Sequence, residues 1–235
     1  MTETETESLE RSKVMLEVSN VRVYDLRESV IASRNPFRTE QVEYTDEEFE
    51  KSLPRAIQLA NTPNGSGHSN WLKGVRVSFD LKYPNYISPE LQRYNFVDIV
   101  SSASKMHRLM EMNLDIACNK YVPKVFIDEM QKLVDRYKGI KDSPEYYKDL
   151  FTLRDGTQLL ARNKQQALYY AFMQCISACP QGIELFMRCS TNYLQLKTIY
   201  HQRKNHKLKE DWVDGFCKNF VEKLPYAKEL IIGEK

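Results

Sequence analysis

The stretch LFMRCSTNYLQLKTIYHQRKNHK, residues 185–207, contains no proline or glycine. Its apolar residues recur at steps of three and four, which is the repeat of one face of an α-helix. The recurring residues are Phe186, Cys189, Tyr193, Leu196 and Tyr200. The spacing predicts one long helix over this stretch.

Two polar residues, Asn192 and Arg203, interrupt the apolar face. In a helix, eleven residues bring them to nearly the same side, about 16 Å apart. Leu196 and Ile199 lie between them. Such a face could hold a long, flat ligand with polar ends. The alternative interpretation, which is the commoner case, is that Asn192 caps a loop and Arg203 is a solvated surface arginine.

The first half of the chain predicts a sheet. In Val75–Tyr83 the apolar residues alternate strictly with polar ones, which is typical of a half-buried strand. Residues 14–26 also alternate, with a break at Ser19-Asn20. We therefore expect a sheet that is covered on one side.

The remaining segments predict helices. Ser88-Pro89-Glu90 is a helix start, and that helix could extend to about Asn113. The other predicted helices are two short ones separated at Pro54 within 46–60, one over 126–138, one over 165–179, and an amphipathic one over 212–224 that ends at Pro225. The sequence thus predicts an α+β fold, with an antiparallel-containing sheet from the N-terminal half packed with long helices.

Composition limits the classes of function. The 235 residues carry a formal net charge of +2, which predicts no strong field toward nucleic acid or membrane. No apolar run is long enough to cross a bilayer. Residues 1–13 are acidic and polar and predict a disordered tail, so we expect a single domain over 14–235. A basic cluster within 197–209 suits a phosphate group but is too short to indicate duplex binding.

The five cysteines, an odd number, predict a reducing, cytoplasmic setting in which thiols serve as small apolar residues. Cys175 and Cys179 share a helix face, but no second pair or histidine stands at zinc spacing. We therefore predict no metal site.

Several segments, taken together over residues 20–224, resemble the flavin-dependent thymidylate synthases. Ala32-Ser33-Arg34 is similar to that family's early Ala-Ala-Arg, and Met106-His107-Arg108 stands where the family has Arg-His-Arg. Asn192, Leu196 and Arg203 fit the pattern Asn-x3-Leu-x6-Arg without a gap. This last match is the most specific one.

The resemblance implies a homotetramer in which FAD lies between subunits. It implies deoxyuridine monophosphate as the substrate, methylene-tetrahydrofolate as the carbon donor and NADPH as the hydride source. The residues that the resemblance assigns to the flavin are His107, Arg108, Asn192 and Arg203. Those that we assign to the substrate are Ser104, Asn113, Lys204 and His206.

The chain departs from the family at several substrate positions. Met106 replaces the first arginine of Arg-His-Arg, and Ile116 stands where the family serine should follow. No arginine follows Arg203, so the nucleotide phosphate would have to bind lysines or histidine without a bidentate contact. Cys118 is out of register with the serine, and nothing in the sequence activates its thiol. The catalytic residues are therefore left unassigned.

Three hypotheses follow. The first is a divergent flavin enzyme that modifies a pyrimidine deoxynucleotide at C5. The second is a catalytically inactive relative that serves as a nucleotide-binding or protein-interaction module. The third is an unrelated helical module whose basic helix binds RNA or a protein partner.

Overall fold

The computed structural model describes residues 15–63, 66–143 and 149–233, which form two compact units. Unit 1 contains the described residues up to Tyr83, Ile87–Ser102 and those from Phe186 onward. Unit 2 contains Pro84–Tyr86 and the described residues between Ala103 and Leu185. The predicted tail, residues 1–13, lies outside the described residues, and a single domain over 14–235 remains a prediction.

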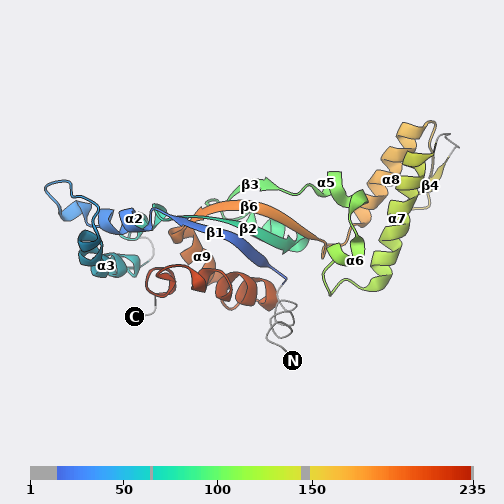
Figure 1. The fold of residues 1–235 in the computed structure, drawn as a ribbon. Helices are drawn as coiled ribbons and strands as arrows, with labels where there is room; N and C mark the ends of the chain where they lie inside the picture. Colours follow the sequence, from blue (N-terminus) through green and yellow to red (C-terminus); the bar gives the residue numbers. More distant parts are fainter. Residues whose placement is uncertain (1–14, 64–65, 144–148, 234–235) are drawn as a thin grey trace, which may run out of the picture. The chain divides into compact units, whose positions relative to one another are not determined.

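Unit 1 is built on a four-stranded sheet with the order β1-β2-β6-β3. The strands are β1 (Glu17–Tyr24), β2 (Arg76–Pro84), β3 (Asp98–Ser102) and β6 (Glu184–Asn192). β1 runs antiparallel to β2, and β3 runs antiparallel to β6. Helix α9 (Tyr193–Arg203) and the C-terminal segment lie on one face of this sheet (Figure 1). The predicted α+β class with antiparallel strands is confirmed.

Strand β2 carries the core of unit 1. Val77, Phe79 and Leu81 are fully buried, whereas the residues between them are partly exposed, as the alternation predicts. The Phe79 ring centroid lies 4.7 Å from that of Phe220 and 6.3 Å from that of Phe216. Burying these rings against one another removes a large apolar surface from water, and this favours folding.

Both edge strands of the sheet are irregular. In β1 the pairing register shifts between Ser19 and Arg22, and Asn20 has a positive φ of 49°. This bulge confirms the predicted break at Ser19-Asn20. In β3 the register shifts between Ile99 and Ser101.

The predicted single helix over 185–207 is wrong, because the segment is strand β6 followed by helix α9. In β6 the alternate residues Leu185, Met187 and Cys189 are buried, while Phe186 is 67% exposed. The apolar residues of this segment fit a repeat of two as well as a repeat of three and four. Pairing of its backbone within the sheet decides in favour of the strand.

The predicted helix over 88–113 is also wrong. Helix α4 (Ser88–Leu91) ends after one turn, and β3 follows it. Only short helices come next, namely α5 (Lys105–Arg108) and a 3-10 turn, η4 (Leu109–Glu111). The start signal was correct, but the β-branched residues of β3 pair with β6 rather than continuing the helix.

Two further helix predictions change in detail. Residues Asp46–Ala60 form one helix, α3, with Pro54 inside it rather than two helices. The last predicted helix is a π-helical segment, η5 (Lys209–Lys218), and a 3-10 turn, η6 (Val221–Lys223). A second π-helical segment, η7 (Lys228–Ile232), ends the described chain. Near the N-terminus the chain forms helix α2 (Leu26–Ala32) and the 3-10 turn η1 (Asn35–Phe37).

Unit 2 is mainly helical. Its helices α7 (Lys124–Asp142) and α8 (Lys164–Ala178) lie side by side, as Figure 1 shows, and both were predicted. The smaller elements are α6 (Leu114–Ala117) and a hairpin of β4 (Leu150–Thr152) and β5 (Gln158–Leu160). The core between them includes Met130 and Val134 of α7 and Cys175 of α8.

We predict that Phe79→Ala destabilises the protein by about 3–5 kcal/mol, because it leaves a cavity beneath the sheet. Phe186→Ala is the matched control, since this phenylalanine is exposed and should change stability by less than about 0.5 kcal/mol. Urea unfolding followed by circular dichroism would measure both. Equal losses for the two variants would contradict the burial described for β2.

Candidate functional site

The side chain of Arg203, at the end of α9, is held on several sides. Its Nη1 lies 3.1 Å from Glu90 Oε2, and its Nε donates a hydrogen bond of 2.8 Å to the Tyr94 hydroxyl. The guanidinium carbon lies 4.6 Å from the ring centroid of Trp212. Arg203 is therefore not a solvated surface arginine, because its side chain is only 14% exposed.

Glu90 connects Arg203 to the C-terminal segment. Its Oε2 accepts a 2.6 Å hydrogen bond from the Trp212 indole and lies 4.0 Å from His206. Burial lowers the pKa of His206, and Arg203 and Lys207 add to this shift although Glu90 opposes it. The neutral ring, with Nε2 at 2.8 Å from Arg203 Nη1, can accept a hydrogen bond from the guanidinium.

Asn192 has a capping role at the other end of α9. Its side-chain oxygen accepts a 2.9 Å hydrogen bond from the Gln195 backbone N–H, and the residue is buried. The predicted apolar floor between Asn192 and Arg203 is not open to a ligand, since Leu196 and Ile199 are fully buried in the core. Thus α9 does not present the extended ligand-binding face that its spacing suggested.

The other predicted flavin residues, His107 and Arg108, lie in unit 2 on the four-residue helix α5, and both are exposed. Arg108 Nε is 3.6 Å from Glu111 in an exposed pair. Ser104 precedes this helix, and the Asn113 side chain caps α6 by accepting from the Asp115 N–H at 3.1 Å. Because Arg203, Lys204 and His206 belong to unit 1, a single site that joins both groups remains a prediction.

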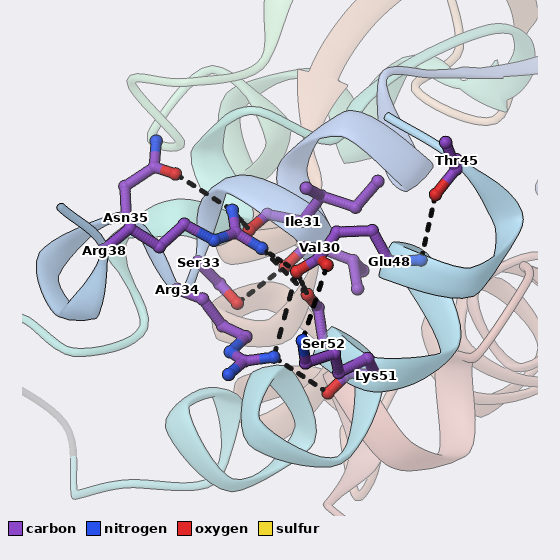
Figure 2. Close-up of polar contacts among 10 residues, drawn as sticks. All are labelled: Val30, Ile31, Ser33, Arg34, Asn35, Arg38, Thr45, Glu48, Lys51 and Ser52. Carbon is purple, nitrogen blue, oxygen red and sulfur yellow. Dashed lines mark hydrogen bonds and ion pairs between the residues drawn. The ribbon is translucent and has the colours of Figure 1, made fainter. Parts of the chain in front are cut away.

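The segment that resembles Ala-Ala-Arg belongs to a polar network that joins α2 to α3 (Figure 2). Arg38 forms an ion pair with Glu48 and donates a 2.9 Å hydrogen bond to the Ile31 carbonyl. Arg34 Nη1 lies 3.8 Å from Glu48 and donates to the Lys51 carbonyl at 3.4 Å. Burial would raise the pKa of Glu48, but Arg38, Lys51 and Arg34 hold it below its usual value. Arg34 therefore has a structural role in unit 1.

Sequence reasoning missed a hollow in unit 1 beside Arg203. The hollow has a volume of about 380 Å³. One side is formed by Arg93–Phe96, and the other by residues of α9, namely Gln195, Thr198, Gln202 and Arg203. We call it the α9 hollow. Because its two sides are distant in sequence and no motif spans them, only the folded chain reveals it.

All five cysteines are free, and four of them are buried. Burial raises the pKa of Cys118 and of Cys175 to about 11, and that of Cys189 and of Cys217 to about 12. Cys118 is therefore packed rather than activated, and its thiol is almost wholly protonated near pH 7. Four of the five thiols are thus packed in the core as small apolar groups, whereas Cys179 is partly exposed. Cys189 lies in a strand rather than in the predicted helix.

Within the described ranges, no group of three or more histidine, cysteine, aspartate or glutamate side chains could hold a metal ion. None of the described helices combines the length and apolar character that crossing a membrane requires.

We predict that Asn192→Ala lowers the stability of the protein by about 1 kcal/mol, since α9 loses its N-terminal cap. Asn192→Asp should retain most of that stability, because a carboxylate also accepts from the helix N-terminus. Thermal unfolding of the three proteins without ligand would test this. A wild-type melting temperature for Asn192→Ala would contradict the capping role.

We also predict that the native protein reacts slowly with a disulfide reagent for thiols at pH 8, because the buried thiols have raised pKa values. Unfolding in guanidinium should release all five thiols at once. A colorimetric time course with peptide mapping would identify the labelled positions. Rapid labelling of Cys118 in the folded protein would contradict its burial.

Comparison with known proteins identifies the fold. No protein-family model matches the chain, and no curated protein sequence matches it. Two solved structures of the flavin-dependent thymidylate synthase ThyX from Helicobacter pylori, both with FAD and dUMP, are similar. The first has a TM-score of 0.61 at 17% identity and the second 0.56 at 16%, and each comparison covers 92% of this chain and 97% of the other. The chain therefore has a fold like that of the flavin-dependent thymidylate synthases.

Proposed function

We propose that the protein is a flavin-dependent enzyme that methylates, or otherwise modifies at C5, a deoxyuridine monophosphate. The observation that carries the proposal is the similarity of fold, which extends over 92% of this chain and 97% of the first ThyX structure. That structure holds FAD and dUMP. The proposal includes a folate carbon donor, NADPH and a homotetramer in the cytoplasm.

The four residues predicted to bind FAD differ in whether their side chains are already engaged by other groups of the protein. His107 and Arg108 are exposed, so their side chains can reach a diphosphate, and Arg suits a bidentate contact with phosphate. Arg203 is already paired with Glu90, and Asn192 caps α9, so these two would position the surrounding elements. When bound, a flavin would supply the redox chemistry, whereas the protein would stack, orient and shield it.

The residues predicted to bind the substrate are less available, because most of them already contact other groups of the protein. Asn113 is engaged as a cap and His206 contacts Arg203, which leaves Lys204 as an exposed cation. Met106 and Ile116 stand where the family has polar residues, and both are exposed. These replacements support a second candidate function, a catalytically inactive relative that binds a nucleotide or a protein partner.

We predict that FAD at about 100 times its Kd stabilises the purified protein by about 2.7 kcal/mol and raises its melting temperature by roughly 5–10 °C. Concentrated protein with FAD should show the visible bands of a bound oxidised flavin. The double variant His107→Ala/Arg108→Ala should bind FAD at least about tenfold more weakly, because charge-assisted hydrogen bonds are lost.

Arg154→Ala is the control, since Arg154 is an exposed arginine of unit 2 outside the predicted site. A protein that neither shifts its melting temperature with FAD nor absorbs as a flavoprotein would refute the proposal. Flavin binding without turnover of dUMP, given methylene-tetrahydrofolate and NADPH, would favour the inactive relative.

A further inference from the structure

The α9 hollow is held open by hydrogen bonds on the side formed by Arg93–Phe96. The Tyr94 hydroxyl accepts from Arg203 Nε at 2.8 Å and donates to Gln202 Oε1 at 3.1 Å. The Phe96 carbonyl accepts a 2.8 Å hydrogen bond from the Thr191 hydroxyl. Because this side is anchored at two points, a ligand would not have to order it, which favours binding.

Three side chains of the hollow are left for a ligand. Gln195 is only 8% exposed. Its backbone N–H donates a hydrogen bond to Asn192, but its side-chain amide makes no hydrogen bond with the part of the chain that the structure describes. Arg93 is exposed and forms no ion pair within that same part. The ring of Phe96 is 58% exposed although it lines the hollow. The amide of Gln195 is therefore available to exchange hydrogen bonds with a ligand in the hollow.

The chemistry of these groups selects a ligand. An amide offers one donor and one acceptor side by side, which matches the edge of a pyrimidine base, and an exposed aromatic ring suits stacking. Arg93 is exposed, so an anionic group paired with it can remain in contact with water. The volume of about 380 Å³ is at the small end for ligand pockets, which suits a mononucleotide rather than a dinucleotide.

We infer that the α9 hollow is a mononucleotide site, in which Gln195 binds the base edge, Phe96 stacks on the base and Arg93 pairs with the phosphate. The inference rests on the proposed function only in the choice of a uracil nucleotide as the ligand. It places the nucleotide on residues other than Ser104, Asn113, Lys204 and His206. It also explains how a chain without a further arginine after Arg203 could bind a phosphate through a guanidinium.

The test uses isothermal titration of the full chain with dUMP and with deoxyuridine, the same base without phosphate. Phe96→Ala should weaken both ligands by about tenfold, because base stacking is lost. Gln195→Met should also weaken both by about tenfold, since the amide is removed at similar length. Arg93→Gln should reduce dUMP binding to the level of deoxyuridine while leaving deoxyuridine binding unchanged.

Two matched controls lie in unit 1 outside the hollow. Phe186→Ala removes a ring of similar exposure, and Arg22→Gln removes an exposed guanidinium of β1, so neither should change binding. Circular dichroism would establish that each variant is folded. The two exposed substitutions at Phe96 and Arg93 keep the test valid if Gln195→Met fails to fold.

The inference is overturned if dUMP does not bind the wild-type protein, or if Phe96→Ala and Arg93→Gln bind it as the wild type does. A flavin titration with the same preparations separates this result from the proposed function. Phe96-dependent dUMP binding without any flavin binding would support the hollow and refute the flavin enzyme. If the protein binds flavin and turns over dUMP, but Phe96→Ala and Arg93→Gln leave the affinity for dUMP unchanged, the flavin enzyme is supported and the hollow is refuted as the nucleotide site.

Discussion

The contact between Arg203 and Glu90 is the interaction on which the organisation of unit 1 depends. It joins the one-turn helix α4, the end of α9 and, through Trp212, the π-helical segment η5. A paired charge in such a partly buried place is tolerated because the guanidinium also donates to the Tyr94 hydroxyl and contacts the His206 ring. Its partners come from segments more than a hundred residues apart, so this contact forms only when the sheet and its covering elements have assembled.

The same contact has a chemical consequence for the site. An arginine that is already paired and stacked on Trp212 has little freedom to move toward a ligand. It can instead fix the Tyr94 hydroxyl, and thereby one side of the α9 hollow, in a single position. A residue that the sequence suggests as a ligand contact is thus, in the folded chain, a support for residues that could contact a ligand.

Much of the fold could be predicted wherever the apolar residues fit only one repeat, that of a strand or that of a helix. The strict alternation of 75–83 has no helical interpretation, and α7 and α8 are long enough for their helical pattern to be clear. Residues 185–207 fit both repeats, because Cys189 and Tyr193 are buried in either arrangement. Strand β3 could not be foreseen, since its five exposed residues owe their conformation to pairing with β6. Tertiary pairing decided these cases over local preference.

The candidate site was predicted only in part. Arg203 stood out as a polar residue on an apolar face. Its side chain has low exposure because it pairs with Glu90 and stacks on Trp212. Gln195 gave no signal, because a glutamine in a helix is ordinary until its neighbours are known. Arg93 and Phe96 belong to a segment that the sequence suggested was helical, which would have separated their side chains from α9. The missing information in each case is the contact between distant segments.

The bulges in the two edge strands of the sheet limit how this molecule can associate with others. β1 is interrupted beside Asn20, and β3 between Ile99 and Ser101, so neither outer strand offers an unbroken row of backbone donors and acceptors. A strand from another molecule would lose its register after a few residues, which discourages open-ended growth of the sheet. Any self-assembly of this chain is thereby directed away from the strand edges and toward contacts made by side chains, which can close on themselves and stop.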